Sequence, residues 1–97
     1  MRTIELEVCN ASGLHARPAA IFVRAATGFR SRLRVRNLLT GAPAVDAKSI
    51  LGVLGLGVGC SGRIEVTAEG EDEQEALATL QDLVANGLGE AQAAPAD

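Results

Sequence analysis

Aromatic residues are almost absent from the 97-residue sequence, which has no tryptophan, no tyrosine and only Phe22 and Phe29. The core must therefore be aliphatic, and an apolar content of 47% is typical of one globular domain. Long apolar runs are also missing, because the longest, residues 50–58, is too short and too rich in glycine to span a bilayer. Since no apolar signal region opens the sequence, we expect a cytoplasmic protein without membrane insertion.

Potential metal ligands and redox groups are scarce. Cys9 and Cys60 are the only cysteines, and His15 is the only histidine. One disulfide is arithmetically possible, but without a secretion signal two free thiols are expected. One histidine and two distant cysteines show no recognisable ligand spacing, so the sequence predicts no metal site and no cofactor.

The net charge of −3 conceals an asymmetry between the two halves of the chain. Acidic residues concentrate in the second half, and the first half carries Arg17, Arg24, Arg30, Arg32, Arg34 and Arg36. Such a basic region would attract an anionic substrate or an acidic protein, although an ordinary solvated surface is the alternative. RNA binding is not expected, because the predicted strands lack stacking aromatic residues and the chain is net acidic.

Alternating polar and apolar residues predict the strands. The pattern covers residues 3–9, 31–37 and 63–69, and a short, weak strand is expected at residues 44–47 after Pro43. Helical spacing predicts a first helix from Ala16 to Gly28. Ser49 is expected to cap a short second helix, and Asp72 with Glu75 to form a capping box for a third.

The order β-α-β-β-α-β-α predicts an α+β fold. We expect a two-layer, open-faced β-sandwich, with a four-stranded antiparallel sheet and three helices on one face. Residues 1–88 should form the domain, and residues 89–97 a disordered tail or a linker remnant.

The most informative segment is Gly13-Leu14-His15-Ala16-Arg17-Pro18-Ala19-Ala20. Ala16 is a poor residue for the expected N-cap position, which leaves amide donors at the helix start without a side-chain acceptor. A phosphoryl group on His15 could bind the amides of Ala16 and Arg17, and the Arg17 guanidinium could add a charge-assisted hydrogen bond. A surface histidine in a turn is the alternative reading of His15 alone.

Three other motifs fail on their context. Residues 57–62 spell G-x-G-x-x-G, but they follow a short helix and precede a strand, so a loop is expected rather than a dinucleotide site. Residues 47–49 resemble the end of a phosphate-binding loop but lack its glycine. Ser12 is near His15 in sequence, yet no placed carboxylate completes a hydrolytic triad.

Three segments together resemble HPr, the histidine-containing phosphocarrier family of the phosphoenolpyruvate:sugar phosphotransferase system. Residues 13–19 are similar to its active-site signature, residues 47–54 to its regulatory-serine segment, and residues 68–73 to the start of its last helix. The similarity spans residues 3 to about 88 in the same order. It implies the open-faced sandwich that the element order also predicts.

The resemblance implies a covalent relay protein rather than a stand-alone catalyst. His15 would accept phosphate on Nδ1 from phosphorylated enzyme I and pass it to the EIIA domain of a sugar transporter. Arg17 would stabilise the phosphoryl group. The surface for these partners would consist of Ala20, Arg24, Ile50, Leu51 and Leu54, although some of its leucines could instead be core residues.

The same resemblance makes Ser49 a candidate site for an HPr kinase/phosphorylase, although a plain N-cap serine needs no such role. A monomer is expected. The alternative function is a module that acts mainly in regulation through phospho-Ser49, or within a dihydroxyacetone kinase or multidomain phosphotransferase system.

Overall fold

The computed structural model describes residues 1–90. It has the predicted element order: β1 (Arg2–Glu7), α1 (Ala16–Thr27), β2 (Arg32–Asn37), β3 (Val45–Asp46), α2 (Ile50–Gly55), β4 (Arg63–Glu69) and α3 (Glu73–Ala85). The α+β fold and the order β-α-β-β-α-β-α are thereby confirmed. Strand ends differ from the expectation by one or two residues, because the alternating pattern continues beyond the paired backbone.

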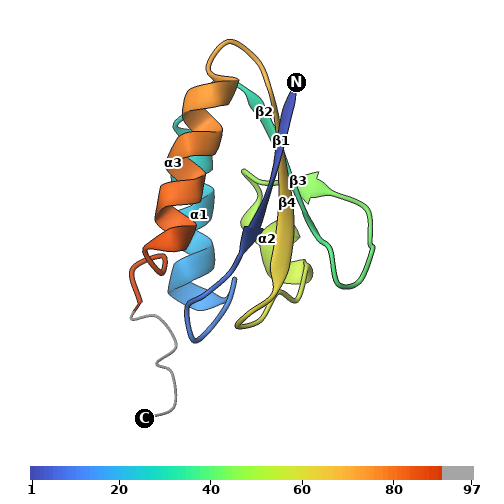
Figure 1. The fold of residues 1–97 in the computed structure, drawn as a ribbon, viewed down its shortest axis with the longest axis vertical. Coiled ribbons are helices and arrows are strands. Elements are labelled where there is room, and N and C mark those ends of the chain that lie inside the picture. The colour runs from blue at the N-terminus through green and yellow to red at the C-terminus, as the bar shows by residue number, and fades with distance from the viewer. Residues whose placement is uncertain (91–97) are drawn as a thin grey trace.

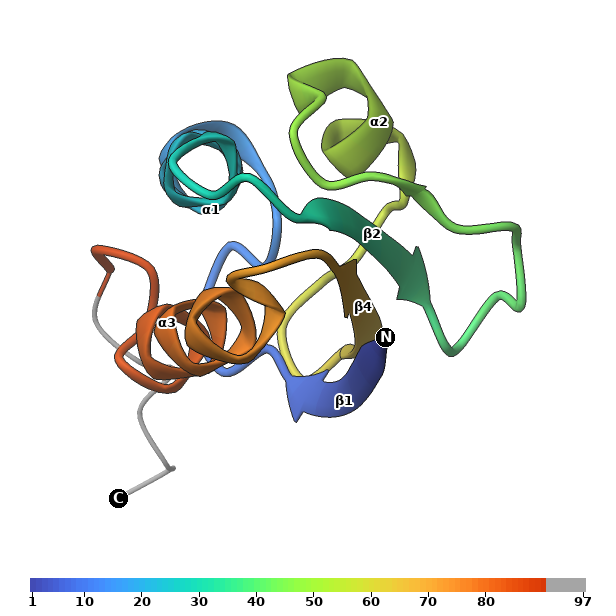
Figure 2. The same ribbon diagram turned by 90° about the horizontal axis from the view of Figure 1, so that it is seen from above.

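The four strands form one antiparallel sheet in the order β1-β4-β2-β3. β4 lies in the interior, where Ile64 is opposite Leu6 of β1 and Val66 is opposite Val35 of β2. The helices lie on one side of this sheet, with α1 between α3 and α2, and the other side is open (Figures 1 and 2). The open face carries the charged residues of the alternating strands, as the pattern predicts.

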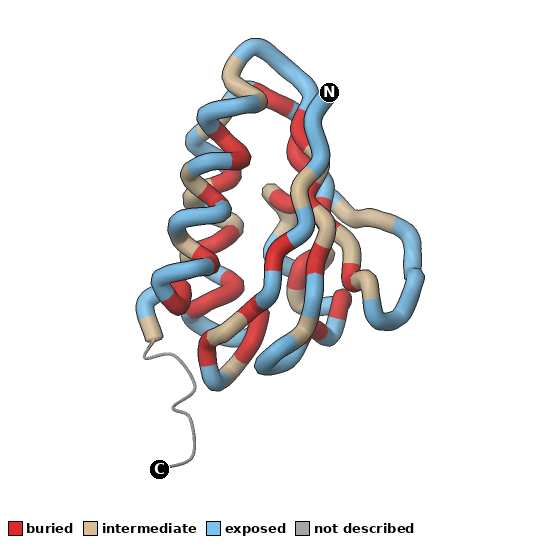
Figure 3. Tube along the Cα trace, in the orientation of Figure 1, coloured by how far each residue is buried: buried red, intermediate tan, exposed pale blue. Residues whose placement is uncertain are grey.

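The core lies between the sheet and the helices and is aliphatic apart from the fully buried ring of Phe22 and the half-buried Phe29 that packs against it. Figure 3 shows buried positions alternating along the strands and recurring along the inner faces of α1 and α3. The other large, fully buried side chains are Leu14, Leu33, Ile64, Leu80, Leu88, Val8, Val35, Val53, Val58, Val66 and Val84. Leu14 directly precedes His15, so core packing anchors the candidate site from below.

The predicted capping box at the start of α3 is wrong. Asp72 occupies the N-cap position, but its side chain makes no capping hydrogen bond. Its carboxylate instead accepts hydrogen bonds from the backbone amides of Arg30 and Ser31 and from the Ser31 hydroxyl. Tertiary contact with the α1–β2 connection takes the carboxylate away from its own helix.

The described chain continues past α3 in a packed turn. Leu88 is fully buried, and Glu90, which was expected to belong to the tail, contacts the loop before α1. The rest of the expected tail, residues 91–97, lies outside the described residues. Within residues 1–90, the helices are too short or too polar to traverse a bilayer.

Candidate functional site

His15 is the N-cap residue of α1, one position before the expected N-cap at Ala16. Its backbone is extended, with φ −130° and ψ 158°, and its side chain makes no capping hydrogen bond. The imidazole is exposed. The histidine therefore lies at the helix start with an exposed ring that does not cap the helix.

The start of α1 retains unsatisfied donors. The first amides of a helix have no intrahelical acceptor, and those of Ala16 and Arg17 donate no hydrogen bond to any residue in the range 1–90. Ala16 adopts φ 50°, a left-handed conformation that is unfavourable for a residue with a Cβ. This end of the helix thus offers amide donors of the kind that can bind an anion, and it carries local backbone strain.

Arg17 supplies a positive charge beside these amides. Its side chain is exposed and forms no ion pair within the described part of the chain. The first turn of α1 contains no acidic residue. Consequently nothing on this helix start competes with a bound dianion, and Arg17 can provide a charge-assisted hydrogen bond.

The loop before His15 lies directly against the loop after α2. Leu14 donates its backbone amide to the Val58 carbonyl at 2.9 Å. Gly13 has φ 65°, and a Cβ at this position would lie 2.3 Å from the Val58 oxygen and 2.6 Å from the Gly59 Cα. Only glycine fits this approach, so the glycine of the motif determines where His15 is held.

The structure also brings together residues that the sequence interpretation missed. The Glu90 carboxylate accepts hydrogen bonds from Asn10 and Ser12, 80 and 78 residues earlier in the chain. Ser12 had been considered only as a nucleophile, and Glu90 had been placed in the tail. No local pattern links two segments so far apart, so only the folded chain reveals this contact.

The predicted partner surface is largely exposed. Helices α1 and α2 pack side by side (Figure 2), and on them Leu51 is 80% exposed and Ile50 39%. Ala20 and Arg24 are exposed on α1, whereas Leu54 is half-buried and packs against the core. The loop that follows α2 contacts the segment before His15, so this surface and the histidine belong to one side of the fold.

Ser49 caps α2 as predicted. Its Oγ accepts a hydrogen bond from the Gly52 amide at 3.1 Å, and its backbone is extended. Ser49 is half-buried. Helix α2 therefore begins with a satisfied cap, in contrast to α1.

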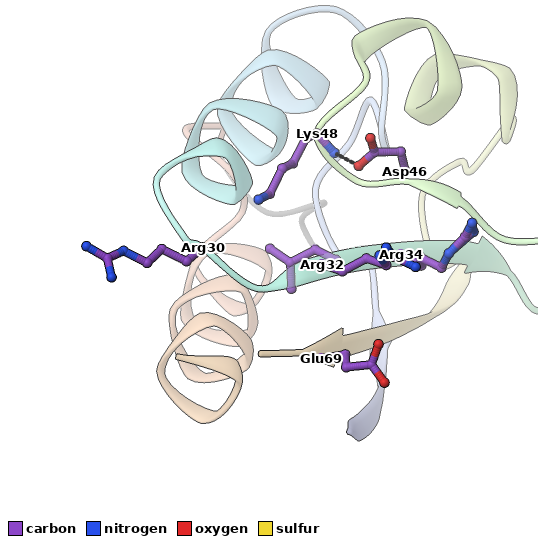
Figure 4. Close-up of a pocket in the computed structure, with 7 residues that line it drawn as sticks. Arg30, Arg32, Arg34, Asp46, Lys48 and Glu69 are labelled. Atoms are coloured by element: carbon purple, nitrogen blue, oxygen red, sulfur yellow. Dashed lines mark hydrogen bonds between the residues drawn. The ribbon is translucent and has the colours of Figure 1, made fainter. Parts of the chain in front are cut away.

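A surface hollow of about 490 Å³ lies away from His15, around the start of β2 (Figure 4). Arg30, Arg32, Arg34 and Lys48 line it together with Asp46 and Glu69. Arg30 extends away from the other two arginines, and the Lys48 Nζ donates to the Phe29 carbonyl. The length of α1, about 18 Å for twelve residues, separates this hollow from the helix start, so we do not assign it to the His15 site.

Fold and site together define a small α+β domain that presents a histidine at an open helix start. The family profile described as "PTS HPr component phosphorylation site" matches residues 2–86. The chain belongs to the HPr family of phosphocarriers of the phosphotransferase system, as the three sequence segments predicted.

Several characterised relatives are similar to the chain. The phosphocarrier protein HPr of Treponema pallidum is 40% identical over 85 residues, which cover 88% of this chain and 93% of the relative. The multiphosphoryl transfer protein of Haemophilus influenzae is 42% identical over 81 residues, 84% of this chain but 16% of the relative. The match covers 22% of the corresponding protein of Vibrio cholerae. The chain therefore spans less than a quarter of these longer proteins.

Solved structures agree with the fold. The crystal structure of HPr-C-His from Thermoanaerobacter tengcongensis has a TM-score of 0.87 at 42% identity, covering 94% of this chain and 99% of that one. HPr from Bacillus anthracis has a TM-score of 0.80 at 36% identity, covering 86% and 95%. A further structure, described as an HPr dimer from Thermoanaerobacter tengcongensis, has a TM-score of 0.72 at 42% identity, covering 93% and 100%.

Proposed function

We propose that the chain is a phosphoryl carrier that accepts the group on His15 from phosphorylated enzyme I and passes it to an EIIA component of a sugar transporter. One observation carries this proposal: an exposed histidine occupies the N-cap of α1 without capping it. In each transfer a ring nitrogen attacks phosphorus, one N–P bond forms and the N–P bond to the donor breaks. The carrier itself catalyses no net reaction.

The open helix start supplies what this transfer needs. Phosphoryl transfer depends mainly on positioning and on charge stabilisation. The amides of Ala16 and Arg17 and the Arg17 guanidinium offer donors around the ring, so the phosphoryl oxygens would complete the missing cap. Once the group has left, the uncapped start returns, so the helix can accept the next phosphoryl group.

For the partners we propose docking over α1 and α2. Leu51 and Ile50 form an exposed apolar pair, and apolar side chains are typical of the centre of a contact surface. Arg24 lies on the adjoining helix without an ion-pair partner in residues 1–90. This combination suits a partner with an apolar centre and an acidic rim.

A direct test incubates the protein with phosphoenolpyruvate and enzyme I. We expect one phosphate that is labile in acid and stable in base, as for phosphohistidine, and its complete loss in His15→Ala. Ser49→Ala is the matched control and should label normally. Failure of the wild-type protein to label with a cognate enzyme I, or undiminished labelling of His15→Ala, would contradict the proposal.

Ser49 is a second candidate for phosphorylation, and its geometry supports a regulatory effect. A phosphate on Oγ would add a charge of about −1.5 to −2 at the start of α2, directly before the exposed Ile50 and Leu51. An acidic partner would then be repelled while the helix start still receives an acceptor. We propose that this modification lowers docking without unfolding α2.

Two matched substitutions test the Ser49 proposal. Ser49→Asp and Ser49→Asn both retain a good N-cap, but only the aspartate adds charge. We expect slower transfer from enzyme I to Ser49→Asp and nearly normal transfer to Ser49→Asn. Equal rates for the two variants would eliminate the electrostatic switch.

We propose a cytoplasmic monomer as the working form. Cys9 and Cys60 are both free, which suits a reducing compartment, and His15 with its partner surface is complete within one chain. Sedimentation at micromolar concentration should give the mass of a single chain, whereas a stable dimer that occludes α1 and α2 would contradict this form.

A further inference from the structure

The segment after α3 turns back towards the loop that precedes His15. Leu88 has φ 51° and is fully buried, and its amide donates to the Leu83 carbonyl. Gly89 lies so close to α1 that a Cβ would stand 2.6 Å from the Ile21 Cδ1. A left-handed leucine is tolerated only where packing compensates for it. The turn is therefore a packed part of the domain, and it fixes the position of Glu90.

At that place the Glu90 carboxylate accepts three hydrogen bonds from the loop. The Asn10 Nδ2 donates to Oε1 at 3.0 Å, the Ser12 amide donates to Oε1 at 3.1 Å, and the Ser12 hydroxyl donates to Oε2 at 2.9 Å. These bonds lower the pKa of Glu90, the Asn10 amide first and then the Ser12 hydroxyl and backbone amide. The carboxylate is thus ionised at neutral pH, and its hydrogen bonds are charge-assisted.

The clasped loop leads directly to His15. Asn10 is fully buried, and its Nδ2 also donates to the Gly13 carbonyl at 2.9 Å. Two acceptors around one nitrogen settle the orientation of this amide. On the other side of the loop, Gly13 and Leu14 press against Val58. The two residues before His15 are therefore held from both sides, by Glu90 through Asn10 and by the loop after α2.

We propose that Glu90 is a positioning residue for phosphoryl transfer, which holds the loop before His15 so that the open start of α1 keeps its strained geometry. This inference rests on the proposed carrier function and adds a role for a residue outside the His15 motif. Glu90 touches no reacting atom in this role. It holds the loop in place, and the held loop keeps Ala16 in its left-handed conformation.

The test uses the full chain and compares Glu90→Ala, Glu90→Gln and Ser12→Ala with the wild type. Glu75→Ala, an exposed glutamate of α3, is the matched control. Hydrogen exchange reports the opening of the loop at the Gly13 and Leu14 amides, and exchange in β4 reports the fold. Rapid-quench transfer from phosphorylated enzyme I gives the rate at His15, and phosphoramidate serves as a second donor that requires no protein partner.

We expect Glu90→Ala to raise exchange at Gly13 and Leu14 by about tenfold, in line with the loss of hydrogen bonds to a charged group, and to leave exchange in β4 unchanged. Transfer to His15 should slow several-fold with both donors. Glu90→Gln, which keeps one carbonyl acceptor, should recover part of both effects, and Ser12→Ala should show a weaker version of each.

The outcomes separate the two proposals. If the wild type labels on His15 but Glu90→Ala transfers at the same rate, or if its rate falls without faster loop exchange, the positioning role is overturned and the carrier function stands. If neither donor labels His15 in the wild type, the carrier function fails and the positioning role fails with it. A slowdown of the same size in Glu75→Ala would also overturn the role, because the effect would then be one of net charge.

Discussion

The starts of α1 and α2 differ in whether the N-cap side chain accepts a hydrogen bond from its own helix. At α2 the Ser49 hydroxyl accepts from the Gly52 amide, whereas at α1 the His15 side chain accepts nothing. Both N-cap residues have extended backbones, so the caps themselves differ in side-chain chemistry, and α1 differs further in the left-handed Ala16 that follows its cap. A satisfied helix start stabilises the fold, and an unsatisfied one is available to a ligand. In this domain the two solutions lie on neighbouring helices.

The most severe way to break the open start is Gly13→Ala. A Cβ would meet the Val58 carbonyl at 2.3 Å with φ at 65°, and overpacking with a left-handed alanine should cost about 3 kcal/mol of unfolding free energy. Urea denaturation measures this loss. Gly41→Ala is the control, because Gly41 has φ 69° with nothing within 4 Å, and it should cost only about 1 kcal/mol. Equal costs would refute the steric argument.

The substitution Arg17→Ala removes the positive charge at the open start of α1. Removal of a hydrogen-bond donor that stabilises the charge of the transition state lowers rates by about 100-fold. We expect a decrease of that size in the rate of transfer to His15, measured by rapid quench. Arg17→Lys should recover part of the rate, since it keeps the charge but not the guanidinium geometry. Arg24→Ala should mainly raise the KM for enzyme I. A rate within twofold of the wild type for Arg17→Ala would contradict its assigned role.

Ser49→Ala and His15→Ala measure what each N-cap side chain contributes to stability. Loss of the Ser49 cap should cost about 1 kcal/mol of unfolding free energy. His15 caps nothing, so its replacement should change stability by less than about 0.5 kcal/mol. Urea unfolding of both variants in the unphosphorylated state measures the difference. A larger cost for His15→Ala than for Ser49→Ala would show that the start of α1 is not open.

The smallest expected effect concerns α3, whose N-cap Asp72 is used elsewhere. The hydrogen bond from the Ser31 hydroxyl and that from the Arg30 amide lower the pKa of Asp72 from 3.8 to about 2. Because the folded-state pKa is depressed, the stabilisation is present above pH 3.8 and is lost as the pH falls towards 2. Asp72→Asn should remove that part of the pH dependence of thermal unfolding, and Asp82→Asn, the control, should retain it.

Much of the fold could be predicted from local patterns. The alternation in residues 63–69 coincides with β4, and the helical spacing from Ala16 to Gly28 coincides with α1. These patterns are reliable because burial on one face of a strand or helix repeats with its own period. The site followed from the residues around His15, where motif, helix start and positive charge are adjacent in sequence.

Two local predictions failed, for different physical reasons. The capping box paired Asp72 with Glu75 by spacing, but the Asp72 carboxylate accepts hydrogen bonds from backbone amides of the α1–β2 connection. Ala16 was placed at the N-cap, whereas the chain turns one residue earlier. The capping-box rule assumes that a polar side chain uses its nearest partner, whereas the Asp72 carboxylate uses donors about 40 residues away in the sequence.

The element order, the aliphatic core and His15 as the candidate phosphorylation site could therefore be predicted from the sequence alone. Each of these depends on residue type and on short-range period. The tertiary structure alone decided that Val58 lies against Gly13 and that Glu90 clasps Asn10 and Ser12. Those contacts join residues 45 to 80 positions apart, and they form only when the core brings together the loop before α1, the loop after α2 and the segment after α3.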